Sequence, residues 1–127
     1  MNPVKLSKVE SGMRLVLEYN QHFNRHDLPA VLQLVNEDVV LESSHPAPGG
    51  DRFAGKAAVA DHLKKIFTEK PDINISIEDL FGLGYRCVMC WHSEWGCAGS
   101  QRQCVRGVDI FKFKDGLICE ILTYVKF

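Results

Sequence analysis

The sequence lacks the features that mark membrane proteins and nucleic-acid-binding proteins. No apolar run approaches the roughly 18–20 residues that a membrane-spanning helix needs, and residues 1–6 do not form the apolar segment of a secretory signal peptide. The net charge is −1 and the basic residues are scattered along the chain, so neither a nucleic-acid footprint nor an anionic-membrane surface is expected. These absences predict a cytoplasmic protein that binds neither nucleic acid nor membrane.

The cysteines also lack the pattern of a disulfide framework or of a zinc site. There are five of them, and an odd number in a chain without a secretion signal favours free thiols. Cys87 and Cys90 form a C-x-x-C, but no second such pair and no histidine pair at zinc-finger spacing follow. Residues three apart in a strand also point to opposite faces. We therefore expect no metal and no cofactor, with a structural zinc site as the less favoured alternative.

What the sequence does contain is an ordered series of helix and strand patterns. Its 127 residues, 46% hydrophobic and 24% charged, suit one domain over residues 1–127 with a modest core. Apolar residues at helical spacing, among them Leu17 and Phe23, follow a capping box at Ser7. The patterns predict helices over 8–24, 28–36 and 56–70, strands over 39–43, 73–81, 85–95, 102–114 and 117–126, a loop over 44–51, and turns at 96–100 and 115–116.

The predicted order is α-α-β-α-β-β-β-β, with the last four strands forming a meander. Strands that follow one another through short turns pair antiparallel, and an amphipathic sheet needs helices on its apolar face. The sequence therefore predicts an α+β fold in which three N-terminal helices pack on one face of a curved antiparallel sheet.

Asp109 is the exception within this pattern, because it lies in the middle of a strand rich in β-forming residues. Aspartate is depleted in strands, and a buried carboxylate is costly unless it is paired or protonated. Alternation places Asp109 on the same face as Phe111 and Phe113. Either that face is open to water, or Asp109 lies on the wall of an apolar pocket. A purely structural carboxylate, hydrogen-bonded to Tyr19, Arg106 or a neighbouring strand, is the alternative.

Three motifs carry a resemblance to a known family. They are Asn-Arg-His-Asp-Leu at 24–28, Phe-Ala-Gly-Lys at 53–56, and the strand-turn-strand segment 106–118, which is followed by Tyr-Val-Lys at 124–126. With the order of elements, they resemble the NTF2-like superfamily and, within it, the SnoaL-like branch of polyketide cyclases and ketosteroid isomerase-like proteins. The resemblance covers nearly the whole chain. It implies a cone-shaped sheet wrapped by helices around an apolar pocket, and a homodimer formed through the sheet.

The resemblance to ketosteroid isomerase implies roles for single residues. Tyr19 falls where that enzyme has its first-helix tyrosine, and Asp109 falls where it has the aspartic acid of its oxyanion hole. Ser43 stands in place of the proton-transferring aspartate, and a serine without an adjacent base is a poor general base. Steroid-type isomerisation is therefore disfavoured. SnoaL-like cyclases use an aspartate on the corresponding strand as acid and base, which implies proton abstraction beside a carbonyl as a second role for Asp109.

His45 is the remaining candidate for proton transfer. It lies two residues beyond Ser43, so an extended backbone would place both on one face, and histidine transfers protons near neutral pH. A loop histidine in solvent is the alternative. A hydrolase would need an Asp-Arg-Asp set around a water, and Arg106 shares a face with Asp109 only if Gly107 forms a bulge, so hydrolysis is not favoured.

The residues expected to line the pocket are Phe23, Ser43, Phe53, Trp91, Trp95, Arg106 and Phe111. Trp91 and Trp95 share one face of their strand, and His92 and Glu94 share the other. The sequence leaves open which of the two faces the pocket. Core or dimer packing is the alternative for both tryptophans.

Together these observations predict an isomerase, cyclase or lyase that transfers a proton on a small apolar carbonyl compound without a cofactor. Asp109, Tyr19 and His45 are its predicted catalytic residues. Two alternatives stay open. One is a binder that uses the same pocket without catalysis, and the other is a dimeric interaction module that uses an exposed face of its sheet.

Overall fold

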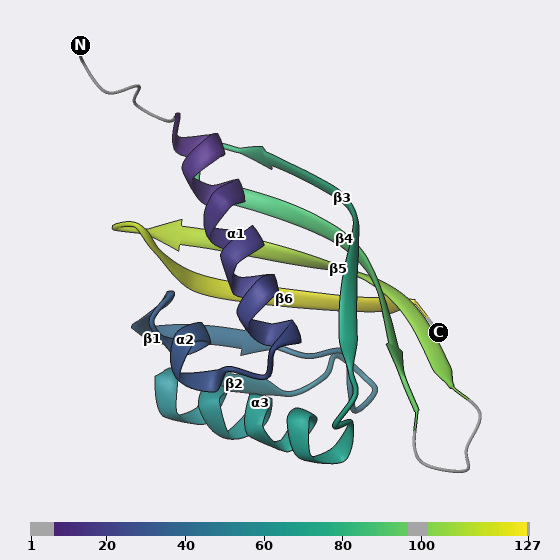
Figure 1. The fold of residues 1–127 in the computed structure, drawn as a ribbon. Coiled ribbons are helices and arrows are strands. Elements are labelled where there is room, and N and C mark those ends of the chain that lie inside the picture. Colours follow the sequence, from purple (N-terminus) through teal and green to yellow (C-terminus); the bar gives the residue numbers. More distant parts are fainter. Residues whose placement is uncertain (1–6, 97–101, 127) are drawn as a thin grey trace.

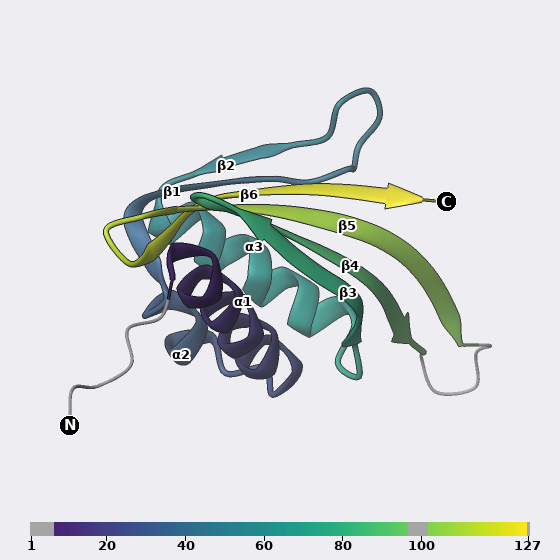
Figure 2. The same cartoon turned by 90° about the horizontal axis from the view of Figure 1, so that it is seen from above.

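One layer of the molecule is a curved sheet of six strands, and three helices cover one of its faces (Figures 1 and 2). The computed structural model describes residues 7–96 and 102–126. The strand order is β2-β1-β6-β5-β4-β3, in which β1 runs parallel to β6 and all other neighbours are antiparallel. The sheet does not close, because β2 and β3 remain its edges. This is the α+β architecture predicted from the sequence, except that the parallel pairing of β1 with β6 makes the sheet mixed rather than antiparallel.

The elements have the following bounds: α1 Lys8–Asn24, α2 Leu28–Leu32, β1 Val35–Glu42, β2 Arg52–Ala54, α3 Lys56–Glu69, β3 Asn74–Leu83, β4 Arg86–Trp95, β5 Gln103–Lys114 and β6 Leu117–Lys126. Helix α1 packs on β3 and β4, whereas α3 packs on β1 and β2. No helix in these described segments is long and apolar enough to cross a membrane.

Local sequence signals explain where α1 begins and how it is held. The Ser7 hydroxyl accepts a hydrogen bond from the Glu10 amide at 3.1 Å, which confirms the predicted N-cap. Near its other end, Asn24 pairs with both backbone groups of Ile75, at 2.8 and 2.9 Å. The prediction that Leu17 belongs to the buried stripe is wrong, because its side chain is 47% exposed; the buried face lies one position away.

The boundary between α2 and β1 differs from the prediction. The Asp27 side chain caps α2, as expected, but the helix ends at Leu32 rather than near Asn36. The reason is that the Leu34 carbonyl already accepts a hydrogen bond from the Ile118 amide of β6, at 2.9 Å. Because this segment is hydrogen-bonded to β6, β1 begins at Val35, four residues earlier than the sequence pattern predicted.

Two further differences concern β2 and the turn after β4. Strand β2 was not predicted, because three residues, Arg52–Ala54, are too few to show an alternating pattern. The turn expected over 96–100 lies outside the described residues except for Gly96. The predicted Asp115-Gly116 hairpin turn is confirmed, since both residues have positive φ, 54° and 78°.

The register of the sheet fixes which side chains face the helices. Across β4, β5 and β6, the inward rows are Cys87–Phe111–Ile121, Met89–Asp109–Thr123 and Trp91–Gly107–Val125. Pairing between β4 and β5 is regular from Trp95–Gln103 to Arg86–Lys112. In these three described rows, Asp109 is the one charged residue among the apolar residues that build the core.

Candidate functional site

Asp109 lies on the inner face of β5 and is only 8% exposed. Its Oδ1 accepts a hydrogen bond from the Trp91 indole Nε1–H of β4, at 3.1 Å. The Thr123 side chain on β6 forms a second hydrogen bond to the carboxyl group. Residues from three neighbouring strands therefore hold this carboxylate, and both hydrogen bonds stabilise its charged form.

Gly107 makes room for the indole. Trp91 and Gly107 are directly opposite each other across β4 and β5, and a Cβ at Gly107 would lie 2.4 Å from Trp91 Cζ2. Real Cβ atoms do not approach other heavy atoms so closely. The glycine in the middle of the strand thus lets Trp91 cross β5 and reach Asp109.

Tyr19 approaches the same region from α1. Its ring contacts the Phe111 ring edge to face, with centroids 5.5 Å apart, and its side chain is buried. Burial, and secondarily the negative charge of Asp109, raise the pKa of Tyr19 above its usual value. Tyr19 therefore keeps its proton and can donate a hydrogen bond at any physiological pH.

Burial destabilises the charged form of the Asp109 carboxyl, and its two hydrogen bonds offset this cost only in part. Burial raises its pKa to about 6, while the hydrogen bonds from Thr123 and Trp91 act in the opposite direction. At pH 7 a group with such a pKa is about nine-tenths ionised. This favours a proton acceptor over a protonated oxyanion-hole donor, because an efficient general base has a pKa close to the working pH.

Ser43 and His45 lie where β1 leaves the sheet. The half-buried Ser43 hydroxyl donates to the His45 carbonyl oxygen at 2.7 Å, and His45 is exposed on the β1–β2 loop. The Ser44 hydroxyl bonds the backbone of β6: it donates to the Thr123 carbonyl oxygen at 2.8 Å and accepts from the Val125 amide at 2.9 Å. The role of His45 in proton transfer stays a prediction.

Arg106 lies on the outer face of the sheet, opposite to Asp109. Regular pairing on both sides of Gly107 means that no bulge turns Arg106 inward. Its Nε and Nη2 donate to the two carboxylate oxygens of Glu78, at 3.1 and 2.6 Å, and His92 Nδ1 lies 3.3 Å from the same carboxylate. The bulge that would have placed Arg106 on the face of Asp109 is therefore not formed, so Arg106 does not lie beside Asp109.

The remaining predicted pocket residues all lie on the side of the sheet that the helices cover. Phe111 and Phe23 are buried core residues, and Phe23 contacts Phe67 of α3 edge to face. Trp95 is partly buried beneath the Lys70 ammonium, 4.2 Å from the ring centroid. On β4, Trp91 and Trp95 therefore lie on the face that the helices cover, whereas His92 and Glu94 lie on the outer face.

Sequence reasoning missed several polar residues around the site. Phe53 stacks on His62 of α3, with centroids 4.0 Å apart, and burial, with the charge of Lys65, lowers the pKa of His62. The inward positions of Thr123 and Ser93 were also missed. The neighbours of a residue on adjacent strands depend on the register of the sheet, which the sequence does not show. Only the alternation of Thr123 with Ile121 could have indicated its inward direction.

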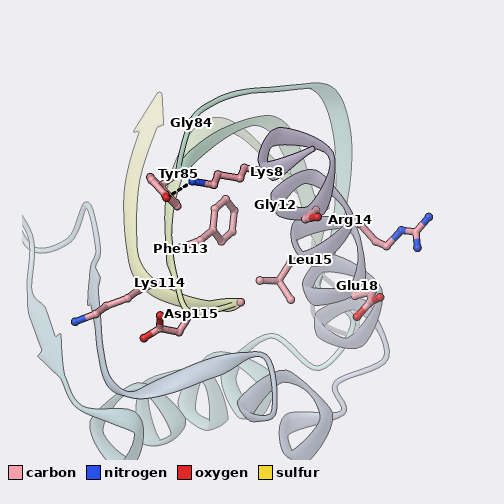
Figure 3. A pocket seen from close by; sticks show the side chains of 12 residues that line it. Lys8, Gly12, Arg14, Leu15, Glu18, Gly84, Tyr85, Phe113, Lys114 and Asp115 are labelled. Carbon is pink, nitrogen blue, oxygen red and sulfur yellow. Dashed lines mark hydrogen bonds between the residues drawn. The ribbon is translucent and has the colours of Figure 1, made fainter. Parts of the chain in front are cut away.

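Two of the grooves on the described surface lie near these elements. One, of about 380 Å³, lies beside the start of α1; Leu15 and Phe113 form its apolar wall, and Lys8 is hydrogen-bonded to Tyr85 across it (Figure 3). The other, of about 410 Å³, lies over Gly107 and is bordered by Trp91, Arg106 and Tyr124. Within residues 7–96 and 102–126, no group of three or more His, Cys, Asp or Glu could hold a metal ion.

Comparison with known proteins agrees with this fold. Residues 16–121 match the SnoaL-like domain, whereas no curated protein matches the sequence. An NTF2-like protein of unknown function from Mesorhizobium loti is 29% identical, with a TM-score of 0.80 over 100% of both chains. A candidate ketosteroid isomerase from Kribbella flavida is 18% identical (TM-score 0.80, 97% of this chain and 83% of that chain). A candidate SnoaL-like polyketide cyclase from Jannaschia is 12% identical (TM-score 0.83, 98% and 92%).

Proposed function

Because the chain belongs to the SnoaL-like domain family of the NTF2-like superfamily, we propose that it moves a proton on a small apolar carbonyl compound, as an isomerase, cyclase or lyase without a cofactor. The observation that carries this proposal is the buried Asp109 carboxylate, which is hydrogen-bonded by Trp91 and lies close enough to Tyr19 for its charge to raise the pKa of the Tyr19 hydroxyl. The descriptions of two relatives as a cyclase and an isomerase support the proposed reaction class. At 12% and 18% identity, their structural similarity to this chain itself shows only a common fold.

In this proposal Asp109 is the general base. Its carboxylate takes a proton from the carbon beside the substrate carbonyl; the C–H bonding electrons form a C=C bond, and the π electrons of the carbonyl move to its oxygen to give an enolate. Tyr19, which stays protonated, donates a hydrogen bond to that oxygen as its charge develops. Return of the proton to a different carbon gives an isomerase; attack of the enolate carbon on a second carbonyl gives a cyclase. His45 on the β1–β2 loop would exchange the proton with solvent.

Proton exchange tests this proposal directly. The probe is 1-tetralone in D₂O, in which loss of the proton signal beside the carbonyl is followed by NMR. The wild-type protein is expected to accelerate exchange, with a rate that rises with pH, is half-maximal near pH 6 and levels off above about pH 7. Asp109→Asn should lower the catalysed rate by about 10²- to 10⁴-fold, the usual contribution of a general base.

The exposed Asp79 on β3 provides the matched control, since Asp79→Asn removes the same charge on the sheet without touching Asp109. Equal exchange by wild type and Asp109→Asn would refute the role of Asp109. Binding of 1-tetralone without any accelerated exchange would instead favour a non-catalytic binder with the same fold.

We also propose that a second copy of the chain covers the outer face of the sheet. An apolar row crosses four strands there, formed by Phe81, Val88, Ile110 and Leu122, and the side chains of Phe81 and the neighbouring Tyr124 are 51% and 58% exposed. Exposed apolar patches of this kind mark interaction sites. Sedimentation equilibrium should give a dimer for the wild type and a monomer for Phe81→Glu; a monomeric wild type would contradict the dimer.

A further inference from the structure

The groove over Gly107, called the outer groove below, has a volume of about 410 Å³. Its residues on β4, β5 and β6 belong to three neighbouring cross-strand rows. The middle row, Trp91–Gly107–Val125, points its side chains toward the helices, so it presents its backbone to the outer face as the floor of the groove. The outer groove therefore lies on the face of the sheet opposite to Asp109.

The two walls of the outer groove differ in their chemistry. One wall is the outward row Cys90–Val108–Tyr124, in which the tyrosine side chain is 58% exposed. The other wall holds Arg106 and Lys126, which are directly opposite each other on β5 and β6. A flat ring suits the first wall, and a carboxylate suits the second.

The charges of the second wall are only partly compensated. Two cations directly opposite each other across strands repel. The Glu78 carboxylate reaches Arg106 from the β3 side and accepts from its Nε and Nη2, at 3.1 and 2.6 Å. In the described part of the chain, no carboxylate forms an ion pair with Lys126. The wall therefore keeps one uncompensated positive charge beside Arg106.

Glu78 also fixes the orientation of the Arg106 guanidinium. The pairing of β3 with β4 shifts between Ile77 and Asp79, which makes Glu78 the extra residue of a bulge, and bulges commonly re-aim a side chain. The two hydrogen bonds hold the guanidinium by one edge and leave Nη1 for another acceptor. A donor that is already held in place loses little entropy when it binds an anion.

We propose that the outer groove binds a small aromatic carboxylate. The ring lies against Val108 and Tyr124, and the carboxylate accepts hydrogen bonds from Lys126 Nζ and Arg106 Nη1. The volume of about 410 Å³ falls within the range of small-molecule sites, roughly 300–1,000 Å³. The site is complete within one chain and has no part in the proton transfer proposed above.

Two probes of the same shape test the recognition of charge. 2-Naphthoate carries a carboxylate, whereas 2-naphthamide carries a neutral amide on the same two rings. In NMR titrations the wild type should bind 2-naphthoate about three- to fivefold more tightly, the contribution of an exposed ion pair, and high salt should reduce this excess. Nuclear Overhauser cross-peaks between the ligand ring and the Tyr124 ring should locate the ligand in the outer groove.

Single substitutions separate the roles of the two walls. Lys126→Gln should remove most of the excess affinity for 2-naphthoate, whereas Tyr124→Ala should weaken both probes alike, by about two- to tenfold. Lys112→Gln is the matched control, because it removes the same charge from β5 about 20 Å away from Arg106. It should bind both probes as the wild type does. Equal affinities of the wild type for the two probes, missing cross-peaks to Tyr124, or a Lys126→Gln variant that keeps the excess would each overturn the proposal.

Two further variants distinguish this site from the features proposed above. Asp109 faces the helices, and the row that contains Tyr124 lies between the outer groove and the apolar row that begins at Phe81. Asp109→Asn and Phe81→Glu should therefore bind 2-naphthoate as the wild type does. Loss of binding in Asp109→Asn would place the ligand on the inner face, and loss in Phe81→Glu would mean that a second copy completes the site. Either result would overturn the proposal, whereas failure of proton exchange alone would refute only the proposed function.

Discussion

The buried carboxyl of Asp109 should make the protein less stable as the pH rises from about 4 to about 6. Burial raises the pKa of Asp109 in the folded state from 3.8 to about 6. Below the unfolded value both states hold the proton, so the carboxyl has no effect on stability. Between the two values the unfolded chain has lost its proton and the folded chain has kept it, so stability falls as the pH rises through this window.

The magnitude follows from the shift. A difference of about two pKa units corresponds to about 3 kcal/mol, at about 1.36 kcal/mol for each unit. Asparagine has nearly the same shape as aspartate, carries no charge and can still accept the Trp91 hydrogen bond. Relative to wild type, Asp109→Asn should therefore be about as stable at pH 4 and up to about 3 kcal/mol more stable at pH 7 and above.

Urea unfolding followed by tryptophan fluorescence between pH 4 and pH 8 measures this difference. Subtracting the wild-type free energy of unfolding from that of Asp109→Asn at each pH removes the contributions of all other titrating groups. Asp79→Asn, at an exposed position, should show no comparable rise. A difference that stays flat from pH 4 to 8, or an Asp109→Asn variant less stable than wild type at pH 8, would refute the reasoning.

Three further predictions concern the surroundings of Asp109 and the attachment of α1. Trp91→Phe removes the indole donor and should raise the pKa of Asp109 by about one to two units, as measured by NMR titration. Gly107→Ala places a Cβ 2.4 Å from Trp91 Cζ2 and should lower the free energy of unfolding by about 1–3 kcal/mol, as measured with urea. Asn24→Ala leaves the Ile75 amide without its side-chain acceptor, while the Ile75 carbonyl keeps the hydrogen bond from Asn20 at 3.2 Å, and should cost about 1–3 kcal/mol in the same assay.

Each of these has an outcome that would contradict it. An unchanged Asp109 titration in Trp91→Phe would mean that the indole does not bond the carboxylate in solution. A fully stable Gly107→Ala would mean that the indole does not lie over β5. Asn74→Ala, at the exposed neighbouring position, is the control for Asn24→Ala, and equal effects of the two would contradict the attachment of α1 to β3.

The sequence predicted the order of the elements because each long element carries its own local signal. The cap at Ser7, the Asp115-Gly116 turn and the alternation of the long strands act over a few residues, so they can be recognised without knowledge of the fold. The end of α2 could not be predicted in this way. It is set by a hydrogen bond from Ile118, which is more than eighty residues away in the chain.

The candidate site was predictable in part, for the same reason. Alternation along β5 placed Asp109 on the face of Phe111, and the structure has both on the inner side. The partners of Asp109 are set by register between strands, so neither the Trp91 hydrogen bond nor that of Thr123 could be read from spacing. The outward position of Arg106 depended on whether Gly107 forms a bulge, and the sequence alone does not decide that.

The titration of the Asp109 carboxyl itself tests the central claim most directly. Carbon NMR of protein labelled at its aspartate side-chain carboxyls gives one curve for each residue, and the signal missing in Asp109→Asn identifies the relevant one. A midpoint near 6 is predicted, as expected for a buried carboxylate ready to accept a proton at neutral pH. A midpoint near 4, the value of an exposed aspartate, would contradict the account.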